Sequence, residues 1–180
     1  MSNFVVNSYS YAAAVVDPQW QTSISSNATG VTYSGSDKIV SLVSVNNAGI
    51  LSNVTDSIKV AVNNGDEFTI GLSYLTDLQG VTDSDALLNS FLANTAAGGC
   101  GYAITVTGGG DAQFKNCHNN TLGTSTWSDD DTFSVAISGG TVVYKQNDAT
   151  KFTETGESGS GFIGGMYGSQ GGSTATYTIS

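Results

Sequence analysis

The sequence predicts a single all-β domain, built as a two-sheet antiparallel sandwich, on three observations. Short β-branched or aromatic runs recur along the chain and are separated by Gly, Asn, Asp and Ser, which is typical of sandwiches. Helix signals are confined to Asp83–Asn94, which is long enough for only about two or three turns inside a loop. A length of 180 residues suits one domain that buries its own core.

The predicted strands follow one another in chain order. They cover Asn3–Val6, Ala12–Val16, Gly30–Tyr33, Lys38–Val45, Ser57–Val62, Glu67–Tyr74, Tyr102–Thr107, Ala112–Asn116, Thr132–Ser138, Thr141–Gln146, Phe162–Tyr167 and Thr174–Ile179. Pro18 ends regular pairing near the start, because proline cannot donate to a ladder. Residues 1–19 are therefore predicted as an N-terminal strand or arm, 20–180 as the sandwich domain, and Thr153–Gly161 as a loop.

Two turns predict hairpins between neighbouring strands. An Asn-Gly pair within Asn63–Asp66 separates two alternating strands, which is the strongest short-range signal for a hairpin. Gly139-Gly140 separates two further alternating runs in the same way. Both pairs of strands are expected to be neighbours in a sheet.

The two cysteines flank a third predicted hairpin, whose tip is Gly108–Gly110. If Val106 pairs with Asp111, Cys100 lies directly opposite Cys117, and the two can form a cross-strand disulfide. A register one residue away would separate them. The alternative is a pair of free thiols that act as small hydrophobic side chains.

Charge excludes two classes of partner. The chain has five lysines, no arginine and 15 acidic residues, for a net charge of −10. Nucleic acids and anionic membranes both require a basic surface, so neither is an expected partner. The opening Met1–Asn7 has no positive region and no long apolar run, so we expect no signal peptide, no membrane span and no export by the ordinary secretory route.

Catalytic motifs are absent, and the protein is predicted not to be an enzyme and to need no cofactor. His118 is the only histidine, and its neighbour Cys117 lies in a polar turn, where a solvated loop histidine is the commoner interpretation. Nearly all acidic residues fall in turns rather than on strands facing a cleft, which disfavours glycoside hydrolysis. A calcium site is an alternative for the acidic turn Asp129–Asp131, although the EF-hand pattern is missing.

The segment Trp127–Tyr144 resembles a recurring hairpin of concanavalin A-like jelly rolls, especially SPRY-like ones. It has an acidic turn, a strand, a glycine turn and a second strand that ends in Val-x-Tyr. Phe68–Ser73, with Gly71 inside it, is similar to the central Gly-Leu-Ser strand of that family. The family usually has Asn-Gly after the tyrosine, whereas this chain has Gln146–Asp148. The resemblance implies a jelly-roll topology for the sandwich.

The opening Phe4–Tyr9 resembles the start of small virion proteins from tailed phages and large DNA viruses. That resemblance implies a capsid decoration, fibre or minor capsid protein on the virion surface or otherwise outside cells. Such a protein assembles with copies of itself and with other virion proteins. The arm residues expected to add a strand to a neighbouring subunit are Phe4, Val5, Val6 and Tyr9.

A carbohydrate-binding module or lectin of the same fold is the alternative. In that hypothesis Trp127 stacks on a sugar ring beside the acidic turn formed by Asp129, Asp130 and Asp131. The two hypotheses differ in an observable way. A virion subunit forms multimers through its N-terminal arm, whereas a lectin binds glycans as a monomer. The virion hypothesis is preferred on the sequence.

Overall fold

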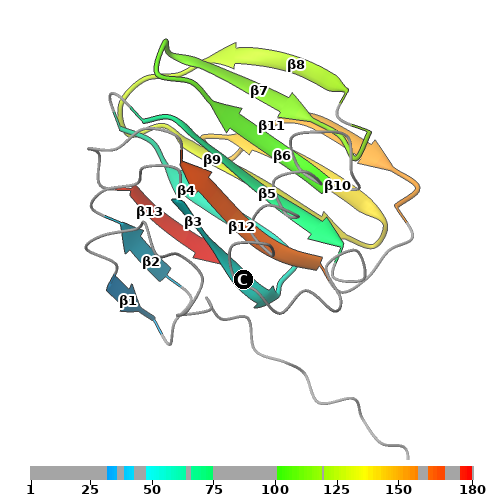
Figure 1. Ribbon diagram of the computed structural model, residues 1–180. Coiled ribbons are helices and arrows are strands. Elements are labelled where there is room, and N and C mark those ends of the chain that lie inside the picture. Colours follow the sequence, from blue (N-terminus) through cyan, green and yellow to red (C-terminus); the bar gives the residue numbers. More distant parts are fainter. Residues whose placement is uncertain are drawn as a thin grey trace, which may run out of the picture.

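The computed structural model describes residues 32–35, 39–42, 48–63, 66–74, 101–118, 120–157, 162–168 and 175–179. All regular elements in these ranges are strands (Figure 1). They are β1 Thr32–Ser34, β2 Ile39–Leu42, β3 Ala48–Val54, β4 Ser57–Ala61, β5 Phe68–Tyr74, β6 Gly101–Val106, β7 Asp111–Lys115, β8 Thr121–Thr126, β9 Thr132–Ser138, β10 Thr141–Gln146, β11 Ala149–Thr155, β12 Phe162–Gly168 and β13 Ala175–Ile179.

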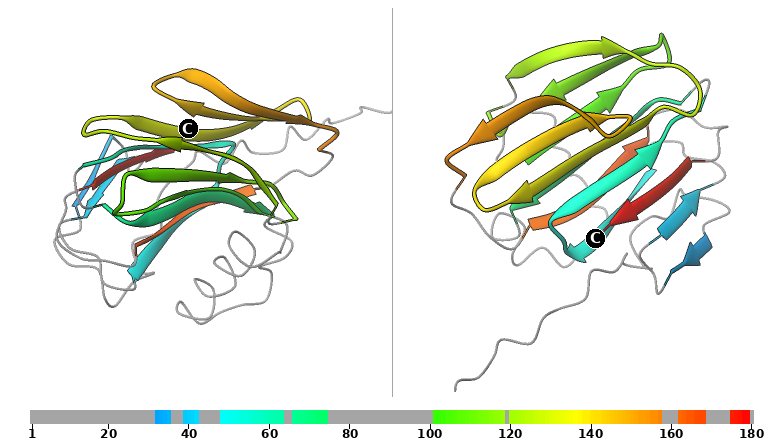
Figure 2. Two further views of the ribbon diagram at one scale, coloured as in Figure 1. Left: turned by 90° about the horizontal axis from the view of Figure 1, so that it is seen from above. Right: turned by 180° about the vertical axis from the view of Figure 1, so that it is seen from behind.

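The strands form two stacked antiparallel sheets, which Figure 2 shows as separate layers. The seven-stranded sheet has the order β1-β2-β13-β4-β9-β10-β11, and the six-stranded sheet has the order β3-β12-β5-β6-β7-β8. Strands distant in sequence pair in both sheets, as in a Greek-key or jelly-roll connection. The predicted two-sheet antiparallel jelly-roll sandwich is confirmed.

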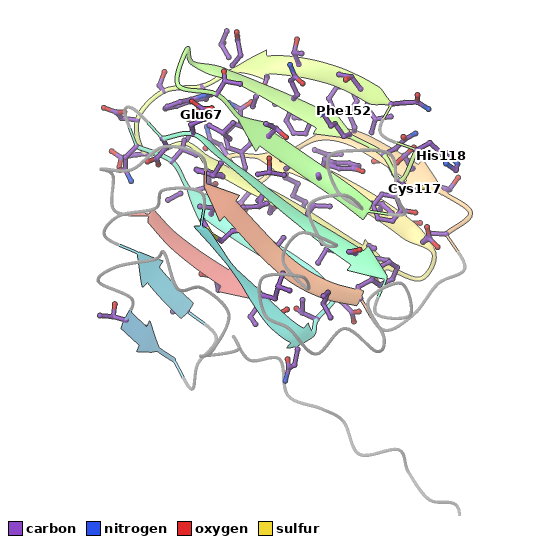
Figure 3. All side chains as sticks on the ribbon, in the orientation of Figure 1. Glu67, Cys117, His118 and Phe152 are labelled. Atoms are coloured by element: carbon purple, nitrogen blue, oxygen red, sulfur yellow. The ribbon has the colours of Figure 1, made fainter. Side chains whose placement is uncertain are left out.

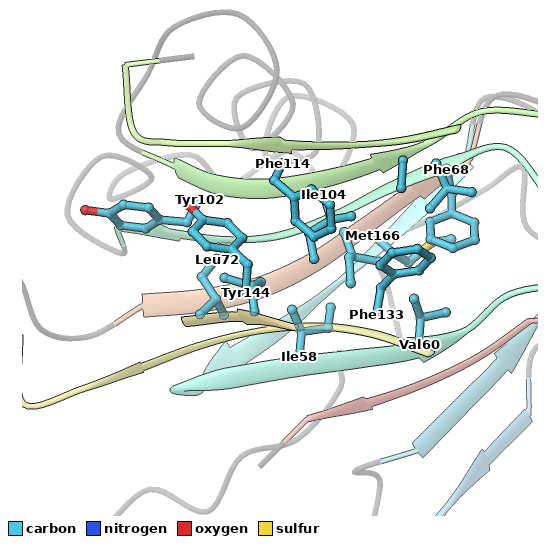
Figure 4. Close-up of a cluster of buried hydrophobic side chains, with 14 of the residues drawn as sticks. Ile58, Val60, Phe68, Leu72, Tyr102, Ile104, Phe114, Phe133, Tyr144 and Met166 are labelled. Atoms are coloured by element: carbon cyan, nitrogen blue, oxygen red, sulfur yellow. The ribbon is translucent and has the colours of Figure 1, made fainter. Parts of the chain in front are cut away.

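The core lies between the sheets, where inward-facing side chains from both layers meet (Figure 4). In β9 and β10 every second side chain is buried, while the residues between them face outward. Phe114 on β7 joins the two layers: its ring centroid lies 6.1 Å from that of Phe133, 6.2 Å from that of Tyr144 and 5.1 Å from that of Phe152. Such aromatic contacts stabilise the sandwich beyond simple area burial.

Three strands were not predicted: β3, β8 and β11. β8 and β11 are the last strands of their sheets and are rich in threonine, so half-solvated positions conceal their alternation. The prediction of a loop from Thr153 onward is wrong for residues 153–155, which belong to β11. This correction is important for the site, because β11 contributes one side of it.

The predicted hairpin at Asn63–Asp66 is wrong. β4 belongs to the seven-stranded sheet and β5 to the six-stranded sheet, so the turn carries the chain from one layer to the other. The Asp66 carboxylate accepts a hydrogen bond from the Asn63 backbone N–H at 2.7 Å, and the Asp66 N–H donates to the Asn63 carbonyl at 3.0 Å. The turn chemistry was recognised, but packing of two apolar faces decides which strands pair.

The hairpin at Gly108–Gly110 forms, with a register one residue from the prediction. Val106 pairs with Ala112 rather than with Asp111. The Thr107 N–H bonds to the Asp111 carbonyl at 2.9 Å, and Gly110 adopts a positive φ of 86°. This is a three-residue loop closed by a left-handed glycine, which shifts the register by one residue.

The hairpin at Gly139-Gly140 is confirmed: Thr141 pairs with Ser138, and both glycines have positive φ. The connection between β10 and β11 also matches the family pattern, in its backbone conformation. Asn147 and Asp148 have φ of 54° and 61° and join β10 to β11, so Asn-Asp adopts the conformation that usually selects Asn-Gly.

Some predictions fall outside the described residues. They include the N-terminal arm over 1–19 with Phe4, Val5, Val6 and Tyr9, and the short helix at Asp83–Asn94. None of the described residues forms a helix long and apolar enough to cross a membrane.

Candidate functional site

Trp127, predicted as a stacking platform, follows β8 and is only partly exposed, because its ring packs against the hydrophobic core. Its backbone N–H continues the β7–β8 ladder with a 2.9 Å bond to the Gly110 carbonyl. Its indole Nε1 is buried and has no hydrogen-bond partner within the described part of the chain. In this position the ring covers one end of the sandwich, and stacking on a sugar remains a prediction.

Both oxygens of the Asp131 carboxylate accept hydrogen bonds from donors in the same chain. Oδ2 accepts from the Ser128 N–H at 3.1 Å and from Gln146 Nε2 at 2.9 Å, and Oδ1 accepts from Asn147 Nδ2 at 2.6 Å. The hydrogen bond from Asn147 contributes most to lowering the pKa of Asp131, and the bond from Gln146 lowers it further. This carboxylate therefore organises the turn rather than presenting free acceptors to a ligand.

Asp129 and Asp130 are exposed beside it. Asp130 has a φ of 68°, and its N–H bonds to the Val62 carbonyl at 2.9 Å, while the Val62 N–H bonds to the Asp131 carbonyl at 2.9 Å. The acidic turn is thus tied to the end of β4. Across the described ranges, no group of three or more His, Cys, Asp or Glu side chains could hold a metal ion, and the calcium alternative stays untested.

The cysteines are not both described. Cys117 is a partly buried free thiol in the turn after β7, and Cys100 lies outside the described residues. The register on which the predicted disulfide depends is the one corrected above. Burial contributes most to raising the pKa of the Cys117 thiol, and the charge of Glu154 raises it further.

A pocket opens at the opposite end of β7 and β10. Figure 3 shows Cys117 and His118 at this end of the sandwich and Glu67 at the other. The cavity measures about 240 Å³, and we call it the Glu154 pocket. Its lining consists of Tyr102, Asn116, Cys117, His118, Val142, Glu154, Thr155, Gly156 and Glu157. Tyr102 and Val142 are buried, and most of the remaining lining residues are polar.

Asn116 holds one wall of the Glu154 pocket. Its Oδ1 accepts from the backbone N–H groups of His118 and Asn120 at 3.1 and 3.0 Å, and its own N–H donates to the Asn120 carbonyl at 3.1 Å. This side-chain mimic of a backbone turn fixes the positions of His118 and Asn120 relative to Asn116. Its Nδ2 donates to Glu154 Oε1 at 3.1 Å, so the turn is also joined to β11.

Tyr144 is not a lining residue, but its hydroxyl lies next to Glu154, which is one. Its hydroxyl donates to the Lys115 carbonyl at 2.8 Å and lies 3.5 Å from Glu154 Oε2. Burial raises the pKa of Tyr144 far above its usual value, and the nearby charge of Glu154 adds to that increase. The Tyr144 phenol and the Cys117 thiol are therefore both neutral at neutral pH.

The opposite wall is anchored to the β9–β10 turn. The N–H groups of Gly156 and Glu157 both donate to the Gly140 carbonyl, each at 3.1 Å. Gly140 has a φ of 76°, and an added Cβ would lie 2.8 Å from the Glu157 carbonyl oxygen. A glycine is required here, because its turn both adopts a left-handed conformation and accepts the close approach of this wall.

Sequence reasoning placed Cys117 and His118 in a polar turn, which is correct, but it missed Asn116, Glu154 and Glu157. The available signal was the alternation of Phe152 and Glu154, which are partly buried, with exposed Lys151, Thr153 and Thr155 in β11. The described structure brings Cys117 and His118 to one pocket, but it brings neither to the Trp127 end, where the binding site was predicted.

A second hollow, of about 210 Å³, lies on the outer face of the seven-stranded sheet. Lys59, Lys145 and Asp148 lie at its rim, and Lys59 Nζ forms an ion pair with Asp148 Oδ1 at 2.9 Å. The hydrogen bond from Lys59 contributes most to lowering the pKa of Asp148. An exposed pair of this kind contributes little to stability.

No protein-family model and no curated protein matches the sequence. Among solved structures, the chain is similar to the PSpry domain of TRIM65, with 9% identity, a TM-score of 0.54 and coverage of 92% of this chain and 90% of that one. It is also similar to stonustoxin, with 8% identity, a TM-score of 0.55 and coverage of 91% of this chain and 28% of that one.

A third similar structure is the carbohydrate-binding module CBM66 from Bacillus subtilis, with 14% identity, a TM-score of 0.48 and coverage of 89% of this chain and 92% of that one. Identities this low show a shared fold alone. They confirm the jelly-roll fold that the Trp127–Tyr144 hairpin implies, whereas the resemblance of Phe4–Tyr9 to virion proteins remains a prediction.

Proposed function

We propose that the protein is a non-catalytic carbohydrate-binding module and that the Glu154 pocket is its binding site. The observation that carries this proposal is a small open cavity, of about 240 Å³, whose polar walls rise from a buried apolar floor of Tyr102 and Val142. Pockets for drug-sized ligands measure about 300–1,000 Å³ and are mostly apolar. A smaller and more polar cavity suits a single hydroxyl-rich ring.

The groups around the cavity support recognition rather than catalysis. The Cys117 thiol has a raised pKa, which disfavours the thiolate that a nucleophile requires. Asn116 is occupied in fixing its turn, and Glu154 holds one hydrogen bond from it. A carboxylate held in this way is suited to accept hydrogen bonds from neighbouring hydroxyls.

The experiment is a glycan-binding screen of the full chain, followed by variants at both ends of the sandwich. Glu154→Ala is expected to abolish binding, while Asp129→Ala, in the acidic turn, leaves it unchanged. Thermal unfolding establishes that each variant is folded. Loss of binding in Asp129→Ala and Trp127→Ala, with normal binding in Glu154→Ala, would return the site to the Trp127 end. Absence of binding to any glycan would reject the proposal.

A second candidate function is self-assembly as a virion structural protein, with the arm residues Phe4, Val5, Val6 and Tyr9 adding a strand to a neighbour. The observation that favours it is the position of β11, a seven-residue strand at the end of its sheet. Terminal strands offer unpaired backbone groups to another chain. Low charge and an acidic net balance also suit a protein that packs in a shell.

Light scattering tests this second function by measuring mass on the full chain and on a chain that starts at Trp20. A defined multimer that becomes a monomer on truncation is the expected result for strand addition through the arm. A multimer that survives truncation rules out the arm, and a full-length monomer leaves the binding module as the single candidate.

A further inference from the structure

Two of the five lysines of the chain lie in one row across the seven-stranded sheet. In the register of β4, β9 and β10, Lys59 pairs with Ser134, and Ser134 pairs with Lys145. The two lysines are thus separated by a single strand, which places their backbones about 10 Å apart with their side chains on the same face. Both are partly exposed, and both line the hollow of about 210 Å³ on the outer face of this sheet.

The floor between the lysines consists of short side chains. Ser134 lies between them, and Ser57 and Ala136, which pair with each other, extend the floor along β4 and β9. Thr178 pairs with Lys59 on its other side and also lines the hollow. Short side chains beside long ones leave a depression, and serine and threonine hydroxyls can donate hydrogen bonds into it. The hollow therefore combines ammonium and hydroxyl donors.

Asp148 already brings a carboxylate to both ammonium groups. Lys59 Nζ lies 2.9 Å from Asp148 Oδ1. The hydrogen bond from Lys59 contributes most to lowering the pKa of Asp148, and the charge of Lys145 lowers it further. The side chains of Lys59 and Asp148 are 43% and 75% exposed, and an exposed ion pair contributes little to stability. A carboxylate from outside the chain can therefore replace that of Asp148 at little cost.

The backbone at Asp148 is less favourable than the turn requires. Asp148 has a φ of 61° and is the second residue of the two-residue turn between β10 and β11, a position at which glycine is preferred. The exposed ion pair offsets at most a cost of similar size. Stability therefore does not account for an aspartate here, and an unfavourable backbone held at a surface hollow points to a function for the side chain.

The charge of this lining is positive, although the whole chain has a net charge of −10. Among the described residues, the charged members of the lining are Lys59, Lys145 and Asp148. Asp56 and Asp131 precede β4 and β9 but do not line the hollow. Exposed charges more than about 8 Å apart are largely screened at physiological ionic strength, so the local excess of positive charge favours an anion.

We propose that this hollow, which we call the Lys145 hollow, binds the carboxylate of a uronic acid between Lys59 and Lys145. The ligand carboxylate displaces that of Asp148, and the sugar hydroxyls accept hydrogen bonds from Ser134 and Thr178. A uronic acid carries a carboxylate and hydroxyls on one ring, which matches the two kinds of donor. The inference goes beyond the proposed function and does not rest on it, because the Lys145 hollow and the Glu154 pocket share no lining residue.

The test compares glucuronate with glucose, which lacks the carboxylate. The full chain is titrated with each sugar, and binding is followed by NMR shifts of the backbone amides. Glucuronate is expected to give saturable shifts in β4, β9 and β10 and to bind about tenfold more tightly than glucose, because a hydrogen bond between charged groups exceeds a neutral one by about that factor. Added salt should weaken the binding of glucuronate and leave that of glucose unchanged.

Variants assign the binding to the Lys145 hollow. Lys145→Gln is expected to weaken glucuronate binding about tenfold. Asp148→Asn should strengthen it severalfold, because it removes the competing carboxylate and keeps the size of the side chain. Lys115→Gln is the matched control: it removes the same charge from the other sheet and should change the affinity by about twofold or less. Thermal unfolding checks that each variant folds, and Asp148→Asn and the salt dependence remain as tests if Lys145→Gln does not.

The outcomes separate this inference from the proposed function. If glucuronate binds no more tightly than glucose, the inference is overturned, whatever Glu154→Ala does to the binding of neutral glycans. If Glu154→Ala abolishes glucuronate binding and Lys145→Gln does not affect it, the ligand lies in the Glu154 pocket and the Lys145 hollow is rejected. Glucuronate binding that survives Glu154→Ala and is lost in Lys145→Gln supports the inference even if no neutral glycan binds. Weaker binding to Asp148→Asn would overturn the displacement of Asp148.

Discussion

A partly buried carboxylate lies at each end of the β10–β11 hairpin. The two carboxylates differ in how many hydrogen bonds they accept from the chain itself. At one end, Asp131 accepts three hydrogen bonds from Ser128, Gln146 and Asn147. At the other, Glu154 accepts one bond from Asn116, and among the described residues its second oxygen has the Tyr144 hydroxyl as its neighbour at 3.5 Å. The same chemical group therefore locks a turn at one end and lines an open pocket at the other.

The comparison shows that an acidic cluster in the sequence is a poor guide to a binding site. The run Asp129–Asp131 attracts attention because three carboxylates are adjacent, yet its most buried member is fully occupied. Glu154 lies between two threonines in an edge strand, and within the described ranges it accepts fewer and longer hydrogen bonds than Asp131. What distinguishes them is the number of donors that the fold brings to each carboxylate, which cannot be counted in the sequence.

The largest expected effect on stability is at the end of the hairpin where Asp131 holds the turn. Asp131→Ala should lower the free energy of unfolding by about 3 kcal/mol, because it leaves the buried Gln146 amide and two further donors without their charged acceptor. Glu154→Ala should cost less than about 1 kcal/mol, since it removes one neutral–ionic bond at an open site. Urea unfolding followed by circular dichroism measures both. Equal losses in the two variants would contradict the distinction between the ends.

The next largest effect lies between the two ends, where Gly123 on β8 faces the ring of Phe152 on β11. A Cβ added at Gly123 would collide with that ring, which also packs on Phe114. Gly123→Ala should therefore cost about 1–3 kcal/mol of stability through overpacking. Gly123→Ala combined with Phe152→Leu should recover part of that loss, because the smaller side chain leaves room for the methyl group. Additive losses in the double variant would show that the two residues do not share this contact.

A smaller effect should appear as a loss of stability in acid, caused by protonation of Asp131. Because hydrogen bonds from Asn147 and Gln146 hold the pKa of Asp131 below its ordinary value of 3.8, its contribution is fully present above that value and is lost as pH falls through the folded pKa. Unfolding free energies of the unmodified protein and Asp131→Asn should converge below pH 3.8. Burial raises the pKa of Asp66, so protonation of this carboxyl favours the folded state as the pH falls. This effect is opposite in sign to that of Asp131 and occurs at higher pH. If the difference in unfolding free energy between the two proteins does not change with pH, Asp131 does not contribute to the acid sensitivity.

The smallest effect concerns the turn that joins β10 and β11. Asp148→Gly should release about 1 kcal/mol of left-handed backbone cost at φ 61°, and it should lose an exposed ion pair worth about 0.2–1 kcal/mol. The net change should be a slight gain in stability. In a Lys59→Gln background the pair is already absent, so the full gain should appear. Thermal unfolding of the four proteins checks this, and an absence of gain in that background would refute the strain argument.

The sequence predicted the architecture because alternation and glycine turns are local signals that agree with the global fold. It could not predict which strands pair across a turn. Asn63–Asp66 has the chemistry of a hairpin, yet β4 and β5 enter different sheets. The pocket was beyond reach for a related reason: Asn116 and Glu154 are 38 residues apart and meet only because β7 and β11 lie in facing sheets. β11, the strand that carries Glu154, was itself partly assigned to a loop.

The position of Glu154 on a terminal strand links the two candidate functions. A chain that adds to β11 forms its ladder with the backbone of the same residues, Glu154 and Thr155, that line the pocket. Ligand binding and edge pairing then act on one element, and if one changes the affinity of the other, thermodynamic reciprocity makes the two changes equal in factor. A sugar that weakens association of the protein would therefore bind more tightly at low protein concentration than at high concentration.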